Sequence, residues 1–252
     1  MQILNGYAQS IHIPIKKKFF VTTATTNLIE ITMLDQHMQM HNDGSLKVSF
    51  DVVSVSNTGY ILQITPLHLN TKIGMNGQEQ KFDTDSSVGR SNPELAKLVA
   101  FLNKPQNIVV ENNKMISGPN LEGLNSTGSR IEDPIKYFLT INPSNIKNGF
   151  LWTDSLINES SKIYNQYTII RNSETEVELN VNTDYDLHLK ASQGEIEMTQ
   201  NLKGFSNGRR IYDKVNGLLK EENLTMDISG NTEYKELSSP MTMKLTFKTI
   251  VN

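Results

Sequence analysis

The sequence predicts an α+β protein, predominantly antiparallel β, folded as an incomplete barrel or strongly curved sheet with a central helical insert. Two observations predict the sheet. Apolar and polar residues alternate with a period of two along much of the chain, which is typical of half-buried strands. Five Asn-Gly pairs and Asp43-Gly44 separate such segments, and both dipeptides tolerate the positive φ angles of tight hairpin turns. Strands joined at hairpin distance pair antiparallel.

The length of 252 residues allows one large domain with a core of its own. We expect a signal remnant or disordered N-terminus over residues 1–14 and a single β-rich domain over residues 15–252. The domain divides into a β half at 15–90, the helical insert at 91–142 and a second β half at 143–252.

The first β half begins with an alternating segment at 29–33 and a clearer one at 46–52, where Leu, Val and Phe take every second position. Asp43-Gly44 is expected to close a hairpin before the second segment. Thr58-Gly59 then turns the chain into a strand at 60–65.

The helical insert rests on two helix starts. Ser91-Asn92-Pro93-Glu94 offers a capping residue, a proline at the first helical position and an acid in the first turn, which predicts a helix up to Leu102. Glu132-Asp133-Pro134 predicts a shorter helix that ends near residue 142. Between them we expect a hairpin at 107–117 and a long surface loop at 117–130.

The second β half repeats the two-residue period. Each repeat is bounded by turn residues, and together they predict consecutive antiparallel strands. The segments are 167–170, 177–181, 196–202, 218–228 and 241–251.

Composition and motifs exclude several classes of protein. The balance of 24 Lys+Arg against 27 Asp+Glu, a net charge of −3, argues against a nucleic-acid binder. The absence of Cys removes thiolate metal sites and a cysteine nucleophile. The longest apolar run, 98–102, is far shorter than the roughly 18 residues of a membrane-spanning helix. There is no Gly-x-Ser-x-Gly motif, phosphate loop or dinucleotide fingerprint, so we expect no enzyme, no catalytic residues and no cofactor.

A calcium loop is one interpretation of residues 83–94. Its oxygen ligands would come from positions 1, 3, 5, 9 and 12, and a helix would follow. The glycine of the sharp turn stands at position 7, Gly89, instead of position 6, so an acidic turn that caps the helix is the alternative, and we assign no metal site. The ligands would be Asp83, Asp85, Ser87, Ser91 and Glu94.

Two histidines, His37 and His41, would share one helical face and could then hold zinc. On a strand they would lie about 13 Å apart, too far for one ion. The alternation around them favours a strand, with Met38 and Met40 on the opposite face. His188 alternates with Leu187 and Leu189 in the same way and is expected to point outward.

Several landmarks of the sequence are turns and strand ends, at residues 77–83, 102–108, 148–155, 203–218 and 239–241. In this order they resemble a family of exported Gram-negative bacterial envelope proteins known only as a domain of unknown function. The resemblance implies an incomplete antiparallel barrel similar to lipoprotein-carrier half-barrels, and a place in the periplasm or on the outer cell surface. Residues 5–10, with Gly6 and Ala8, are similar to the tail of a secretory signal.

We therefore expect a non-enzymatic envelope protein that holds a lipid-like or other hydrophobic ligand in its curved sheet. The ten Met, among them Met33, Met38, Met40, Met241 and Met243, suit an adaptable lining. A structural or interaction protein of the envelope with a filled core is the first alternative, and an unrecognised hydrolase is the second. Trp152 is expected to pack in the core or at the barrel mouth.

Overall fold

The protein is all-β in the computed structural model, in which 81% of the described residues lie in strands. The predicted α+β class is therefore wrong, whereas the antiparallel, strongly curved sheet is observed. The structure describes residues 17–33, 36–56, 58–75, 77–86, 99–100, 102–111, 114–118, 134–139, 141, 145–193, 196–234 and 237–252.

One antiparallel sheet contains all the strands, in the order β6-β5-β3-β2-β1-β12-β11-β10-β9-β8-β7, with β4 paired to the end of β3. A short 3-10 turn, η2 (Pro134–Tyr137), lies off the sheet. The strands are β1 (Lys18–Met33), β2 (Gln36–Val55), β3 (Gly59–Met75), β4 (Gln78–Asp83), β5 (Gln106–Glu111), β6 (Lys114–Ser117), β7 (Leu151–Ile157), β8 (Ser161–Asn172), β9 (Glu176–Gln193), β10 (Ile196–Asp213), β11 (Leu219–Tyr234) and β12 (Leu237–Val251).

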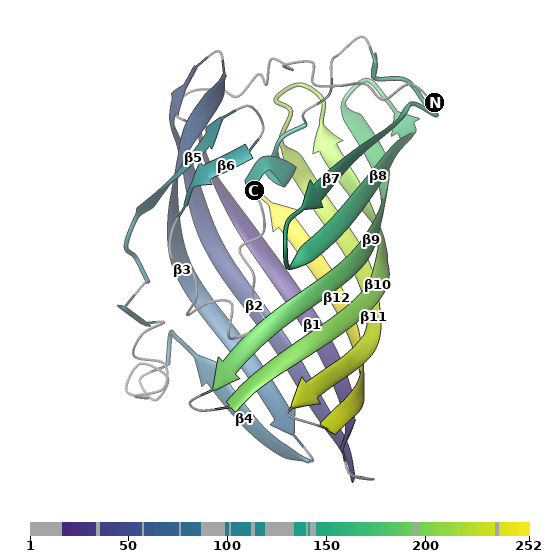
Figure 1. Cartoon of the computed structure of the whole chain (residues 1–252). Helices are drawn as coiled ribbons and strands as arrows, with labels where there is room; N and C mark the ends of the chain where they lie inside the picture. Colours follow the sequence, from purple (N-terminus) through teal and green to yellow (C-terminus); the bar gives the residue numbers. More distant parts are fainter. Residues whose placement is uncertain are drawn as a thin grey trace.

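The first and last strands of the chain meet in the middle of the sheet. β1 pairs with β12 from Val21↔Val251 to Ile31↔Met241, which joins the two β halves into one continuous surface. The sheet coils so that its two ends, β5–β6 and β7, face each other across an opening, and the concave face lies inside (Figure 1).

The predicted helical insert at 91–142 is not supported. Its described residues form the hairpin β5–β6, which confirms the strands expected at 107–117, and the single turn η2 in place of the second helix. Of the first expected helix, Val99 and Ala100 are described, and they are helical. Phe138, the residue directly after η2, forms an antiparallel bridge with Leu218. The backbone at this position therefore has strand geometry, where the sequence pattern predicted a helix. Residues 91–98 of the first expected helix and 119–130 of the expected loop lie outside the described residues.

Some of the described Asn-Gly and Asp-Gly pairs lie in turns, and others lie inside strands. Gly77, Gly149 and Gly217 have positive φ angles of 85°, 80° and 67° and lie in turns, as predicted. Gly208 lies inside β10 and Gly44 inside β2, so the hairpins expected from Asn207-Gly208 and Asp43-Gly44 are wrong. The glycine at position 208 is explained by the close approach of β11, because a Cβ there would lie 2.4 Å from the backbone oxygen of Asn223.

The core fills the upper part of the concave face as drawn in Figure 1, where η2 lies inside the curved sheet. We call residues 134–139 and 141 the plug. Phe19 of β1 stacks on Phe50 of β2 with their ring centroids 5.2 Å apart, and Phe138 of the plug meets Phe19 edge-on at 5.9 Å. These side chains are at most 3% exposed, so each contributes roughly the full burial energy of an aromatic residue.

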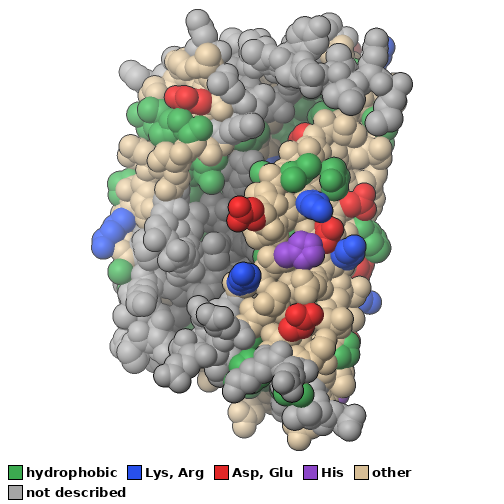
Figure 2. Space-filling model, in the orientation of Figure 1, with side chains coloured by type: hydrophobic (Ala, Val, Ile, Leu, Met, Phe, Trp, Pro, Cys, Tyr) green, Lys and Arg blue, Asp and Glu red, His purple; other side chains and the backbone are tan. Residues whose placement is uncertain are grey.

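The outer face of the sheet carries most of the charge. Basic and acidic side chains are interspersed over the strands on the right of Figure 2, without a patch of one sign on that part of the surface. Among the described residues, no helix combines the length and the apolar character needed to cross a membrane.

Candidate functional site

The lower half of the concave face remains apolar below the plug. Strand register places Ile29 of β1 opposite Met243 of β12 and Met40 of β2, and Ile31 opposite Met241 and Met38. Because side chains alternate between faces, these residues point to the same side as Phe19 and Val21 of the core. We call the following cluster the lower apolar face: Ile29, Ile31, Leu187, Leu189, Leu202, Met226, Ile228, Met241 and Met243.

Most of the lower apolar face is only partly buried. Leu202, Ile228 and Met241 are 2%, 7% and 4% exposed, whereas its other six members keep part of their surface uncovered. The Met241 sulfur accepts a weak hydrogen bond from the Thr232 hydroxyl at 3.5 Å. The upper half of the same sheet is closed by the plug, so the two halves of one concave face differ in how completely the described residues cover them.

Uncharged polar side chains lie between the two halves on both sides of the sheet's centre. On one side Asn27 lies opposite Asn42, and on the other Thr183 lies opposite both Asn165 and Ser206. Leu245 of β12 and Met226 of β11 lie between these two groups at the same register level. Thr183 donates to Asn165 Oδ1 at 2.7 Å, and Thr71 donates to Asn42 Oδ1 at 2.8 Å. We call this set the polar row, and its members are Asn27, Asn42, Thr71, Asn165, Thr183 and Ser206.

A buried ion-pair cluster fastens the plug to the sheet above the polar row. Glu222 of β11 is fully buried, and its carboxylate accepts hydrogen bonds from Lys136 Nζ and Arg210 Nε, both at 2.7 Å. Thr249 of β12 donates to the same carboxylate at 3.3 Å, and Tyr212 donates its hydroxyl to the backbone oxygen of Lys136 at 2.8 Å. The cluster therefore joins the plug to β10, β11 and β12.

Burial and charge act in opposite directions on the pKa values of this cluster. Burial alone would raise the pKa of Glu222, but the neighbouring Arg210 and Lys136 outweigh it and hold this pKa at about 2. Burial lowers the pKa of Lys136 against the opposing effect of Glu222. Burial also raises the pKa of Tyr212 to about 12, so this phenol stays protonated as the donor to the plug.

Sequence reasoning missed this cluster, although strand parity carried a signal for it. Glu222 shares its face of β11 with Leu224, Met226 and Ile228, which places a carboxylate on the apolar side of the strand. In the sequence it stands in Lys220-Glu221-Glu222, a run that otherwise reads as an exposed charged segment. The role of Lys136 has no such signal, because its partner is 86 residues away.

The acidic turn at residues 83–85 is contacted by a histidine that the calcium interpretation did not include. His68 of β3 places its Nε2 atom 3.1 Å from Asp83 and 3.6 Å from Asp85, and the three ligand atoms lie within 4.8 Å of one another. Asp83 also accepts a hydrogen bond from the Asp85 backbone N–H at 2.8 Å, which with His68 lowers its pKa. The cluster is satisfied by its own ion pairs, and Ser87, Ser91 and Glu94 lie outside the described residues.

The expected strand geometry at the two histidines of β2 is confirmed. His37 pairs with Glu30 at 3.8 Å, and His41 pairs with Asp43 at 2.7 Å, so each imidazole has its own partner. His188 is an exposed residue of β9 that pairs with Asp186 and Asn201, as expected for an outward position. The Trp152 ring stacks on Tyr167 at 5.0 Å and packs against the core, in agreement with its prediction.

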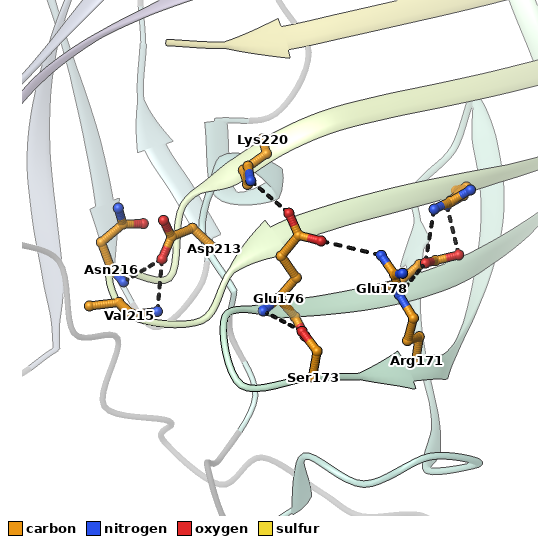
Figure 3. A network of polar contacts seen from close by, with 9 residues as sticks. Arg171, Ser173, Glu176, Glu178, Asp213, Val215, Asn216 and Lys220 are labelled. Carbon is orange, nitrogen blue, oxygen red and sulfur yellow. Dashed lines mark hydrogen bonds and ion pairs between the residues drawn. The ribbon is translucent and has the colours of Figure 1, made fainter.

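Outside the concave face, an ion-pair network lies at the upper ends of β8 to β11 (Figure 3). Glu178 accepts a hydrogen bond from Arg209 Nη2 at 2.9 Å and forms ion pairs with Arg209 Nε at 2.7 Å and Arg171 Nε at 3.1 Å. Glu176 accepts from Lys220 at 2.6 Å and from Arg171 at 3.2 Å. The carboxylates of this network pair with its cationic side chains, so the network joins neighbouring strands.

The outer face also holds an open groove of about 260 Å³ over β1, β11 and β12. Most of the side chains around it are small or polar, and Leu224 and Phe247 supply its larger apolar part. Its lining includes Ala24, Thr26, Asn223, Thr225, Thr246 and Lys248.

The fold of the sheet is similar to that of part of one solved protein. A solved structure of lipovitellin, described for its lipid–protein interactions, matches 95% of this chain with a TM-score of 0.55 and 8% sequence identity. The chain spans about a quarter of the lipovitellin chain, since the match covers 25% of it. At this identity the likeness shows the fold of the sheet.

Two further matches are more distant. An outer membrane channel from Pseudomonas putida F1 matches at a TM-score of 0.27 and 6% identity, with all of both chains covered. DynF of the dynemicin biosynthesis pathway of Micromonospora chersina matches at 0.24 and 5%, over 99% of this chain and 86% of that one. No protein-family model and no curated protein matches the sequence, so the resemblance to exported envelope proteins stays a prediction.

Proposed function

We propose that this protein is a non-enzymatic binding protein that holds a lipid-like or other apolar small molecule against the lower apolar face. The observation that carries the proposal is the unequal cover of the concave face. Tyr137 and Phe138 of the plug close its upper half, while six apolar side chains of its lower half stay partly uncovered. A partly covered, concave apolar surface is the usual lining of a small-molecule site.

The composition of the lower apolar face suits this role. Three of its nine members are methionines, whose unbranched side chains adapt to ligands of different shape. Covering one such side chain with a ligand contributes about 25 cal/mol per Å² of apolar area removed from water. The curved sheet shared with lipovitellin supports the proposal, because that protein's structure was described for its interactions with lipid.

A structural or interaction protein remains the second candidate, and the packed upper half favours it. The edge strand β7 adds exposed apolar side chains, since Leu151, Leu156 and Ile157 are 51%, 56% and 59% exposed. Such an edge offers unpaired backbone groups to another strand. The expected envelope location rests on the sequence resemblance alone, and the proposal includes no catalytic step.

Binding is tested with N-phenyl-1-naphthylamine, an uncharged apolar dye whose fluorescence rises out of water. The wild-type protein should bind it saturably, and Met243→Gln should weaken binding about fivefold to tenfold, the loss expected from about 1 kcal/mol of apolar contact. Thr242→Gln is the matched control, because residue 242 is the exposed neighbour on the outer face of the same strand. Absence of saturable binding, or equal losses in both variants, would refute the proposal.

A further inference from the structure

We infer that the ligand of the lower apolar face carries an uncharged hydroxyl-type head group that donates a hydrogen bond to Asn27. This inference rests on the proposed function and adds the chemical class of the ligand. Long-chain alcohols, sterols and monoacylglycerols share this chemistry: an apolar body with a neutral donor at one end.

Asn27 lies at the boundary between the apolar and polar parts of the concave face. It follows the core residues Phe19 and Val21 at even spacing along β1, and Ile29 of the lower apolar face comes two residues later. Asn27 is 8% exposed, and its Oδ1 atom is buried without a hydrogen-bond partner. A polar head at this level would leave the apolar body of the ligand on Ile29 and Met243.

The unpaired oxygen is an exception within the polar row. Asn42 Oδ1 accepts from Thr71, Asn165 Oδ1 accepts from Thr183, and Ser206 shares a hydrogen bond with Tyr185 at 3.1 Å. A buried acceptor without a donor destabilises the folded protein, so native structures rarely keep one without a reason. A donor supplied by a bound ligand accounts for its presence at this position.

The charges around the row favour a neutral head group. The described members of the polar row carry no charge, and Asp154 at the exposed edge of the sheet already accepts from Asn165 at 2.6 Å. The Glu222 carboxylate above the row is held by Lys136 and Arg210. A carboxylate head would place an acceptor against the Asn27 acceptor, and an ammonium head would lose its water without a counter-ion.

The test compares three ten-carbon probes that differ only in the head group: 1-decanol, decanoate and decylammonium, at pH 8. Each is titrated against the wild-type protein loaded with N-phenyl-1-naphthylamine, and the displacement of the dye is measured. We expect 1-decanol to displace the dye at a concentration at least about fivefold lower than either ion, a margin that corresponds to one hydrogen bond.

Asn27→Leu keeps the size of the side chain and removes the acceptor. It should reduce the preference for 1-decanol about fivefold, with each probe compared against the variant's own affinity for the dye, and raise the Tm of the unliganded protein, because a buried unpaired oxygen is lost. Thr26→Leu, on the outer face of the same strand, is the control that should alter neither the preference nor dye binding.

The outcomes separate the two proposals. Dye binding with a preference for either ion, or with a preference for 1-decanol that is undiminished in Asn27→Leu, overturns the neutral head group and leaves the apolar site standing. Absence of dye binding by the wild-type protein overturns the apolar site, and the head-group inference with it.

Discussion

Lys136 is the residue on which the attachment of the plug depends most directly. Its ammonium group is buried against Glu222, and truncation leaves that carboxylate with one cation fewer. We expect Lys136→Met to reduce the free energy of unfolding by about 3–5 kcal/mol, as for other broken buried ion pairs. Urea unfolding followed by Trp152 fluorescence measures the loss.

The matched control for that prediction is Lys220→Met. Lys220 makes an ion pair of similar length with Glu176, but its side chain is 51% exposed, so water screens the pair. Its loss should be much smaller than that of Lys136→Met. Equal losses would mean that the plug is not held by the buried pair.

The same cluster predicts a dependence of stability on pH. The pKa of Glu222 falls from its ordinary value of 4.5 to about 2 in the folded protein. A carboxyl group with a lowered folded pKa stabilises the fold above its unfolded pKa and loses this contribution as the pH falls through the folded pKa. The difference in Tm between the wild type and Glu222→Gln should therefore shrink between pH 5 and pH 2. A difference that stays constant over this range would contradict the assigned ion pairs.

At the scale of the element, β10 depends on glycines where it crosses close to β11. A Cβ at Gly204 would lie 2.2 Å from the backbone oxygen of Asp227, and Gly208 is similarly restricted. Gly204→Ala should lower the free energy of unfolding by about 1–3 kcal/mol or more, because the two strands must move apart. Thermal or urea unfolding checks it.

Lys203→Ala is the control for this substitution, since the Lys203 side chain next to Gly204 is 78% exposed. It should leave the stability unchanged within error. If Gly204→Ala were equally harmless, the close approach of β10 and β11 would be wrong.

The strands could be predicted from the sequence far better than the structure of the segment at 91–142, for which helices were expected. The period-two alternation at 46–52 and 241–251 identifies β2 and β12, because one face of each is buried and the other is not. The turn signal failed at Gly208, since a glycine that permits close strand contact has the same sequence appearance as one in a turn. The helix prediction for the segment after Pro134 was also wrong, because tertiary contacts of Phe138 override the local helix pattern.

The apolar character of the site could be predicted from the sequence, whereas its individual polar and charged residues could not. Alternation placed Met38 and Met40 on the face opposite His37 and His41, which anticipated an apolar interior. The buried Glu222 and the unpaired Asn27 depend on which residues the register brings opposite them, and one strand alone does not reveal this. The approach of His68 to Asp83 and Asp85 likewise arises from the pairing of β3 with β4.

At the scale of the whole molecule, the concave face of one curved sheet has two apolar regions, an upper one and a lower one. The plug closes the upper one with Tyr137, Phe138 and Ile141, and a polar row separates it from the lower apolar face. Stability and ligand binding are therefore expected to depend on different ends of the same strands, so that a substitution at the lower apolar face weakens binding without unfolding the protein.

The most direct test of this account is methyl NMR of the methionines, with each signal assigned by substitution, during titration with N-phenyl-1-naphthylamine. Met226, Met241 and Met243 lie on the lower apolar face, whereas Met115 of β6 is 51% exposed. The account predicts saturable shifts of the first three signals and none at Met115. Shifts that are largest at Met115, or no saturable shift at any of the three, would contradict it.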